Sequence, residues 1–321
     1  MTAASGEPAA GEHPETTEIR LKFFTVDVFT TRRFAGNPLA IVEDADGLDD
    51  ETMQAIAREF NLSETIFVQA PADPANTARV RIFFPTAEIP FAGHPTIGCA
   101  IHLAAKRHPD GSDFATRIVL EEAAGLVPVD VERRDGVATA QFTAPVLPHA
   151  HDGEVPSPEQ AAAALGLAPE DIGFGSTAIG LYAGGPAYLY VRLASRPTLA
   201  QARPCEPQWS RMTAAANVDA AYVYTPGGEA AETDFSARMF SPASGILEDP
   251  ATGSATAILA GPLLAAGSLE EGTNRFRLEQ GCDMGRPSQL GLEIDVVGQA
   301  LTAVRISGSS VRVSAGELIL D

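Results

Sequence analysis

The sequence PTIGCA at residues 95–100 and the sequence PATGSA at residues 250–255 share the pattern Pro-x-x-Gly-small-Ala. Each follows a second shared pattern, Arg-x-Phe-x-Pro, at residues 81–85 and 238–242. Each also leads into a segment that is apolar on nearly every face, which predicts a helix enclosed by protein on all sides. Two matched motifs in matching order favour an internal duplication. The sequence therefore predicts two similar halves, each with one central helix.

Around these central helices, predicted over residues 96–105 and 252–264, the chain carries many short strands and few long helices. Asp49 is positioned to cap a helix over residues 50–60, and another helix is expected over residues 158–165. This pattern is typical of an α+β fold rather than of a doubly wound parallel sheet. The predicted strands, rich in β-branched and aromatic residues, lie near residues 21–29, 39–42, 64–68, 78–84, 117–121, 126–132, 139–142, 177–181, 187–193, 220–225, 237–240, 275–279, 291–297, 300–306, 310–313 and 316–320.

Composition along the chain predicts a tail and two domains. Residues 1–18 are rich in Ala, Glu, Pro, Thr and Gly, which predicts a disordered tail. A first domain is expected over residues 19–145, and a Pro- and His-rich stretch at 145–158 reads as the linker that follows it. The second domain is expected over residues 146–306. The final strand, about residues 307–321, is predicted to return to the first domain.

Composition also excludes several classes of function. The 321 residues include 22 basic and 42 acidic ones, and the net charge of −20 disfavours nucleic-acid binding. Neither of the two lysines, Lys22 and Lys106, follows a glycine, so a P-loop is excluded. Both are expected on the surface at the ends of elements, which disfavours a pyridoxal-phosphate enzyme. The six histidines are spread along the chain without an HExxH motif, so no metal site is expected.

Cysteine use and hydropathy predict a cytoplasmic protein. The three cysteines, Cys99, Cys205 and Cys282, are far apart in the sequence and form no CxxC pair. An odd set of cysteines without a secretory signal is typical of reduced thiols in the cytoplasm. No apolar run approaches the ~18 residues that a transmembrane helix requires. Neither a membrane nor a nucleic acid is therefore expected as a partner.

Polar residues lie at the start of each predicted central helix. His94 precedes the first helix, Glu248 and Asp249 precede the second, and Ser254 lies inside it. The free N–H groups of a helix N-terminus favour an anion such as a carboxylate. If the two halves face each other, both helix starts point into one cleft, and these residues form a candidate acid/base set. The alternatives are a loop histidine at 94, a helix cap at 249 and a small packing residue at 254.

Taken together, the motifs resemble the phenazine biosynthesis PhzF-like family, within the diaminopimelate epimerase fold superfamily. The resemblance extends over about residues 24–320. Its landmarks are VDVFT at 26–30, GNPLA at 36–40, NLSET at 61–65, Glu88 with PFAGHPT at 90–96, EDPATGSA at 248–255, and Gly281 with MGRPS at 284–288. The resemblance implies two pseudo-repeated domains, each a mixed β-sheet barrel around one central α-helix, with the functional site between them.

The resemblance also implies roles for individual residues. Glu64 is the expected acid/base, and the other expected catalytic residues are His94, Asp249 and Ser254. The expected substrate-binding residues are Gly93, Thr252 and Gly253. Related epimerases carry two cysteines beside the substrate carbon, whereas this chain has Ala92 and Pro250 at those places. A two-thiol mechanism is therefore not expected.

The function implied by the resemblance is that of a cofactor-free isomerase. Glu64 would move a proton and a double bond on a small carboxylate-bearing substrate, and the protein is expected to be a homodimer. Two alternatives stay open at this point. One is a racemase or epimerase that needs no pyridoxal phosphate and uses Glu64 and His94 as its two bases. The other is a small-molecule binding protein without catalytic activity.

Overall fold

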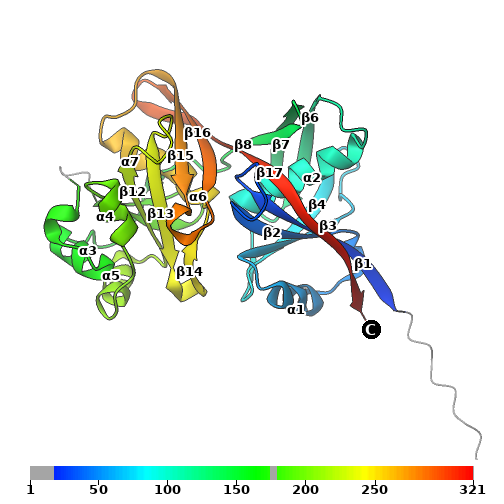
Figure 1. Cartoon of the computed structure of the whole chain (residues 1–321), viewed down its shortest axis with the longest axis horizontal. Helices are drawn as coiled ribbons and strands as arrows, with labels where there is room; N and C mark the ends of the chain where they lie inside the picture. The colour runs from blue at the N-terminus through cyan, green and yellow to red at the C-terminus, as the bar shows by residue number, and fades with distance from the viewer. Residues whose placement is uncertain (1–17, 174–178, 321) are drawn as a thin grey trace, which may run out of the picture.

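The computed structural model of the chain describes residues 18–173 and 179–320, which form two lobes (Figure 1). The N lobe holds the strands from β1 to β8, and the C lobe holds the strands from β9 to β16. The last strand, β17 (Ala300–Leu320), runs from the C lobe into the N lobe. Except for Glu18, the predicted tail lies outside the described residues. The domain boundaries proposed at residues 145 and 306 stay predictions.

Eight strands of the N lobe close into a barrel. Their pairing order is β17, β1, β2, β3, β4, β6, β7, β8 and again β17. Two of the pairs, β2 with β3 and β4 with β6, are parallel. A sheet closed on itself leaves no free strand edge. The strands of this lobe are β1 (Ile19–Val28), β2 (Asn37–Val42), β3 (Glu64–Gln69), β4 (Ala78–Phe83), β5 (Glu88–Ile89), β6 (Phe114–Glu122), β7 (Gly125–Arg134) and β8 (Val137–Thr143).

The helix α2 (Gly93–Arg107) lies inside this barrel, where it contacts β1, β2, β3, β6, β7, β8 and β17. Eleven of its 15 residues are buried, as expected for a helix that is apolar on nearly every face. A polar contact joins its first turn to the barrel wall, because Thr96 Oγ1 lies 2.7 Å from Glu122 Oε1. The barrel therefore holds the start of α2 in a defined place.

The C lobe repeats the strand order of the N lobe. The strands β10, β11, β12, β13, β15, β16 and β17 pair in succession. The second and the fourth of these pairs are parallel, as are the second and the fourth pairs of the N lobe when they are counted from β1–β2. Inside lie α6 (Gly253–Ile258) and α7 (Ala260–Ala265), which contact β16 and β17. This order agrees with the predicted duplication. The other elements are β9 (His149–Ala150), β10 (Ile179–Ala183), β11 (Ala187–Arg192), β12 (Ala221–Pro226), β13 (Phe235–Ser241), β14 (Ile246–Asp249), β15 (Gly272–Gln280), β16 (Ser288–Val297), and the outer helices α3 (Pro158–Leu165), α4 (Arg196–Gln201) and α5 (Gln208–Ala216).

Local capping signals account for two helices that have the predicted bounds. The helix α1 (Asp50–Phe60) begins where Asp49 Oδ1 accepts a hydrogen bond of 2.8 Å from the third helical N–H. It ends at Asn61, whose φ of 49° is left-handed. The helix α3 begins with a capping box at Ser157 and ends at Gly166, whose φ is 68°. Such signals act within a few residues, which is why the sequence alone predicts them.

Two predicted helices and three predicted strands were wrong in detail. The first central helix begins at Gly93, so His94 lies in its first turn rather than in the loop before it. The second is divided into α6 and α7, because Pro262 has no N–H to donate to the carbonyl four residues earlier. The three strands predicted after residue 299 form the single strand β17, because β16, β8 and β1 pair with it in turn.

Short elements were the ones that the sequence patterns missed. The helices α4 and α5 and the strands β5, β9 and β14 were not predicted, and none of them exceeds nine residues. In so short a segment, the spacing of apolar residues cannot distinguish a helix or strand from a loop. Part of the strand predicted at residues 177–181 lies outside the described residues, and β10 is described from Ile179 onward.

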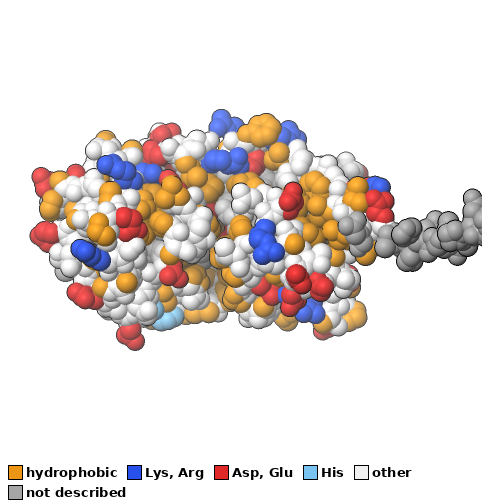
Figure 2. All heavy atoms as spheres, turned by 90° about the horizontal axis from the view of Figure 1, so that it is seen from below, with side chains coloured by type: hydrophobic (Ala, Val, Ile, Leu, Met, Phe, Trp, Pro, Cys, Tyr) orange, Lys and Arg blue, Asp and Glu red, His pale blue; other side chains and the backbone are white. Residues whose placement is uncertain are grey.

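Helix hydropathy and surface charge are the two structural features that bear on a membrane or a nucleic acid as partner. Within the described part of the chain, no helix is long and apolar enough to span a membrane. Figure 2 shows one face of the molecule, on which acidic and basic side chains are scattered over both lobes. No continuous basic stripe of the kind that a nucleic-acid backbone requires runs across this face of the described residues. The cytoplasmic location and the homodimer stay predictions.

Candidate active site

The starts of α2 and α6 meet between the two lobes. A Cβ atom built on Gly93 would lie 3.1 Å from the Cα atom of Gly253, so the first residues of the two helices are in contact. Thr252 is the N-terminal cap residue of α6. Glycine at both helix starts permits this close approach, because a side chain on either would push the helices apart. The three predicted substrate-binding residues therefore lie together in the structure.

Glu64 and His94 form a buried pair at this junction. Glu64 is the first residue of β3, His94 is the second residue of α2, and Glu64 Oε2 lies 3.4 Å from His94 Nε2. Their side chains are only 10% and 3% exposed, so both groups are largely removed from solvent. Neither Glu64 Oε2 nor His94 Nε2 has a hydrogen-bond partner. Buried polar atoms without partners are rare in folded proteins, and they call for an explanation such as a binding or catalytic role.

The His94 ring is neutral, and we assign its hydrogen to Nδ1. The assignment follows from a bond between the ring and the backbone carbonyl of Pro38, because Nε2 has no partner. Asn37 Nδ2 also lies 3.3 Å from Nδ1, but its hydrogens go to Asp249 Oδ1 at 2.8 Å and to a backbone carbonyl at 2.9 Å. Burial lowers the pKa of His94 to about 3. Nε2 therefore presents a lone pair to the Glu64 carboxyl group.

Asp249, the last residue of β14, is held by side chains from both lobes. Its Oδ1 accepts hydrogen bonds from Asn37 Nδ2 at 2.8 Å and from Ser63 Oγ at 3.5 Å, both in the N lobe. Its Oδ2 accepts a hydrogen bond from Thr252 Oγ1, which in turn accepts one from Gln280 Nε2 at 2.9 Å. Asp249 is therefore not the cap of α6, which is the role of Thr252. It joins the two lobes at the site.

Burial raises the pKa of both carboxyl groups. The pKa of Glu64 is raised well above its ordinary value, first by burial and then by the charge of Asp249. Burial raises the pKa of Asp249 to about 6, against the hydrogen bonds from Thr252, Asn37 and Ser63 that lower it. Two interacting carboxyl groups titrate as a pair. Both carboxyl groups therefore keep a proton to higher pH than they would in water, and the charge of each affects the titration of the other.

Ser254 lies apart from the hydrogen bonds around Asp249. Its hydroxyl oxygen lies 2.9 Å from the hydroxyl oxygen of Tyr188 in β11. The pKa of Tyr188 is raised, mainly by burial and also by the charges of Asp249 and Glu64. The Tyr188–Ser254 pair is therefore within electrostatic reach of the two carboxyl groups. Of the four predicted catalytic residues, the structure joins Glu64, His94 and Asp249 through short contacts and places Ser254 beside them.

Four side chains around the site had no predicted role. Asn37 and Ser63 lie inside two of the motifs quoted above, and Gln280 directly precedes the motif glycine at 281. Their presence in or beside motifs is a signal that could have selected them. Tyr188 lies in an ordinary strand pattern, and nothing in the local sequence distinguishes it from a core tyrosine. It reaches the site only through the packing of β11 on α6.

The described residues offer no arrangement suited to a metal ion. In residues 18–173 and 179–320, no three His, Cys, Asp or Glu side chains form a group that could hold one. The chain does contain one H-x-H pair, His149 and His151, near β9. A ring nitrogen of each bonds to a backbone carbonyl, that of Leu147 and that of Asn217.

Known proteins share both the sequence and the fold of this chain. The family model described as phenazine biosynthesis-like protein matches residues 26–316. Over 301 residues the chain is 42% identical to an uncharacterized isomerase of Mesorhizobium japonicum, an alignment that covers 93% of this chain and 98% of the relative. Over 301 residues it is 36% identical to the trans-2,3-dihydro-3-hydroxyanthranilate isomerase of Pseudomonas aeruginosa, with 93% and 99% covered.

The fold agrees with that of a solved structure. The PhzF-family phenazine biosynthesis protein of Bacillus anthracis superposes with a TM-score of 0.81 over 94% of this chain and 100% of that chain, at 23% identity. The resemblance inferred from the motifs is therefore confirmed, and the alternative of a binding protein without catalytic activity is set aside. The chain belongs to the PhzF family of phenazine biosynthesis-like isomerases.

Proposed function

We propose that the chain is a cofactor-independent isomerase in which Glu64 moves a proton, and with it a double bond, on a small carboxylate-bearing substrate. The observation that carries the proposal is the buried Oε2 of Glu64, which has no partner and lies 3.4 Å from a neutral imidazole nitrogen. A carboxyl group with a raised pKa is present in both protonation states near its working pH. It can therefore take a proton from one carbon and give it to another.

In the proposed reaction, Glu64 removes a proton from one carbon of the substrate and returns it to a second carbon on the same face. His94 Nε2 accepts a hydrogen bond from protonated Glu64 and keeps the carboxyl group oriented. Asp249 orients the substrate, and its charge strengthens Glu64 as a base. The N–H groups near Gly93 and Gly253, with the Ser254 hydroxyl, hold polar oxygens of the substrate.

The geometry weighs against the alternative of a racemase or epimerase with two bases. Such an enzyme needs its two bases on opposite faces of one carbon atom. Glu64 Oε2 and His94 Nε2 lie 3.4 Å apart, which leaves no space for a carbon between them. The pair is instead suited to act on one face of the substrate, with the imidazole supporting the carboxyl group.

The first substrate to test is trans-2,3-dihydro-3-hydroxyanthranilate, because a relative that is 36% identical is named for its isomerisation. The purified protein is incubated with this compound in D₂O, and the product is examined by NMR and chiral chromatography. We expect a shifted double bond and one deuterium at a single carbon. Deuterium with inversion of one stereocentre and no shifted double bond would support an epimerase instead. No deuterium in this compound or in a panel of unsaturated carboxylates would contradict the proposal.

Replacing Asp249 with Asn is expected to move the pH profile to lower pH. The charge of Asp249 raises the pKa of Glu64, so its removal lets Glu64 lose its proton more readily. The rising limb of kcat/KM, which reports the titration of the carboxyl pair, should shift down by about one pH unit. The value of kcat should also fall, because the substrate loses one orienting group. A limb that stays in place or moves to higher pH would show that Asp249 does not act on Glu64 through its charge.

A further inference from the structure

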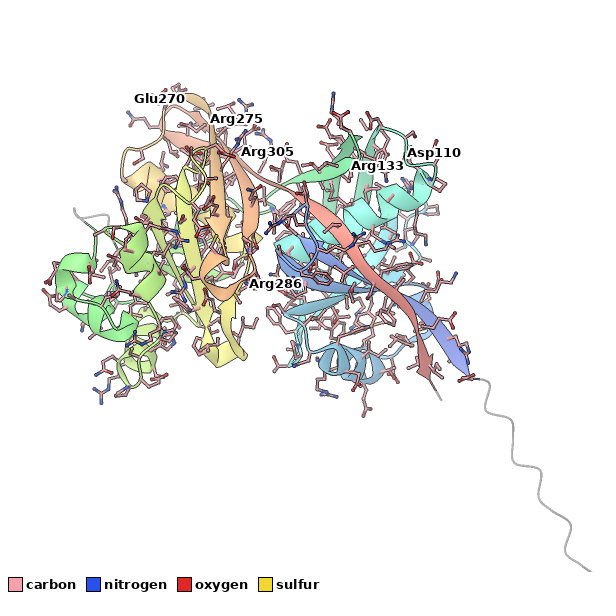
Figure 3. The ribbon with its side chains drawn as sticks, viewed as in Figure 1. Asp110, Arg133, Glu270, Arg275, Arg286 and Arg305 are labelled. Atoms are coloured by element: carbon pink, nitrogen blue, oxygen red, sulfur yellow. The ribbon has the colours of Figure 1, made fainter. Side chains whose placement is uncertain are left out.

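Two motifs of the sequence supply no residue to the Glu64–His94–Asp249 cluster, yet they contact each other across the lobes. One is VDVFT at residues 26–30, at the end of β1, and the other is MGRPS at residues 284–288 in the C lobe. Figure 3 labels Arg286 of the second motif, which lies where the two lobes meet. Its side chain reaches the N lobe and bonds there to Asp27 and to the turn at residues 34–36.

The side chains of the turn at residues 34–36 do not stabilise its backbone conformation. Phe34 and Gly36 both have a left-handed φ of 67°, which is unfavourable for phenylalanine. The Phe34 side chain is 73% exposed, so packing of its ring contributes little. A Cβ atom on Gly36 would lie 2.2 Å from the Val28 carbonyl oxygen, so position 36 requires glycine. The turn therefore depends on hydrogen bonds to its backbone.

Those hydrogen bonds come from Arg286 and from the residues around it. Arg286 Nε donates to the Gly36 carbonyl at 2.8 Å, and Arg286 Nη2 donates to the Ala35 carbonyl at 2.9 Å and to Asp27 Oδ1. Asp27 Oδ2 accepts a hydrogen bond from the N–H of Phe34 at 2.6 Å. The N–H of Gly36 donates to a backbone carbonyl of the C lobe at 3.1 Å. The planar guanidinium is suited to this task because its donors have fixed directions.

The residue that follows the turn is Asn37, the first residue of β2. Its side chain is fully buried and donates both of its hydrogens across the lobes, to Asp249 and to the Ala251 carbonyl. The same nitrogen lies 3.3 Å from His94 Nδ1. A shift of the turn would move Asn37 and change the surroundings of both His94 and Asp249.

We propose that Arg286 is a positioning residue of the active site, which acts through the turn at residues 34–36 to hold Asn37 between His94 and Asp249. The proposal rests on the proposed function in one respect, because it takes His94 and Asp249 to be working groups of the isomerase. The chain of contacts from Arg286 to Asn37 stands without that assumption. A competing explanation is that Arg286 only joins the two lobes.

Arg305 provides a matched control for the loss of an ion pair. Its side chain is 26% exposed, the same as that of Arg286, and Figure 3 labels both. It pairs with Glu293 and Asp295 of β16 at 2.6 Å each, and it lies in β17 where that strand also pairs with β8 of the N lobe. Arg305→Gln therefore removes a comparable arginine without touching the turn or Asn37.

The test compares Arg286→Gln with Arg305→Gln in the full-length protein without substrate. Hydrogen exchange at the amides of residues 34–37 should become about 10-fold faster or more in Arg286→Gln, because the turn loses its donors. The ¹⁵N resonances of the His94 imidazole should shift, since Asn37 moves against the ring. Arg286→Lys should restore part of both effects, and Arg305→Gln should show neither. With an identified substrate, Arg286→Gln should lower kcat much more than it changes KM.

Two results would overturn the proposal. One is an Arg286→Gln protein with unchanged exchange at residues 34–37 and unchanged His94 resonances. The other is an equal change in Arg305→Gln, which would indicate a general loosening of the fold. If Arg286→Gln does not fold, Asp27→Asn tests the same bridge with a smaller change and should shift the same signals in the same direction. The hydrogen-exchange and NMR results do not depend on turnover, so failure of the proposed function would be seen separately in the D₂O assay.

Discussion

Replacing Glu64 with Gln is expected to reduce substrate-dependent deuterium exchange by about 10³-fold, the usual range for loss of a general acid/base. The glutamine keeps nearly the same shape and its amide can donate a hydrogen bond to His94 Nε2, so the fold should persist. It cannot take a proton from carbon. The measurement is the rate of deuterium incorporation in D₂O at several pH values, with circular dichroism to confirm folding.

The matched control is Glu43→Gln. Glu43 also pairs with a histidine of α2, since its Oε1 lies 2.8 Å from His102 Nε2, and its side chain is 5% exposed. This pair lies toward the other end of α2, away from the contact with α6. We expect Glu43→Gln to keep most of the exchange activity while it folds. Full exchange in a folded Glu64→Gln protein would show that another group carries the proton.

The second large effect concerns stability and involves Glu122. Thr96 Oγ1 lies 2.7 Å from both the Ala92 carbonyl and Glu122 Oε1. A hydroxyl has one hydrogen, so if Thr96 donates it to Ala92, protonated Glu122 must donate to Thr96. Burial raises the pKa of Glu122 to about 8, which agrees with a neutral carboxyl group in the folded protein.

A pKa raised by folding makes stability fall as pH rises. Below about pH 4.5 the Glu122 carboxyl group is protonated in both states, and between pH 4.5 and about pH 8 only the folded protein keeps the proton. We expect the unfolding free energy of the natural protein, relative to that of Glu122→Gln, to fall by about 3 kcal/mol from pH 5 to pH 8. Urea titrations of both proteins at each pH measure this difference. A difference that does not depend on pH would mean that Glu122 is ionised in the folded state.

The motifs predicted the location of the site, but they do not distinguish its Glu–His pair electrostatically from a second such pair. Glu64 with His94 and Glu43 with His102 each pair a glutamate with a histidine of α2. The pKa of Glu43 is lowered to about 2, mainly by its bond to His102, with Lys106 as a second donor. The pKa of Glu64 is raised, because burial outweighs any donor. Only the packed structure distinguishes the two pairs, since the difference depends on which ring nitrogen carries a hydrogen and on whether a lysine reaches the carboxylate.

The fold was predictable where signals are local and less so where they depend on distant partners. Asp49 and Ser157 cap the helices that they were expected to cap. The repeated motifs predicted two enclosed helices because a helix that is apolar on all faces is stable only when protein surrounds it. Asn37 and Arg286 could not be assigned roles in the same way. Asn37 acts across the lobes on Asp249, and Arg286 acts through a turn that lies far away in the sequence.

The path of β17 determines the order in which the molecule can be assembled. Residues 305–320 supply the strand between β8 and β1, although they come after all of β9 to β16 in the chain. A ribosome therefore releases β1 and β8 long before their shared partner exists, and each has an unpaired edge until then. Because the N lobe is begun first and completed last, its folding waits on synthesis of the C lobe. A nascent chain that stalls before β17 is synthesised has an open N-lobe barrel, and its unpaired strand edges need protection by chaperones.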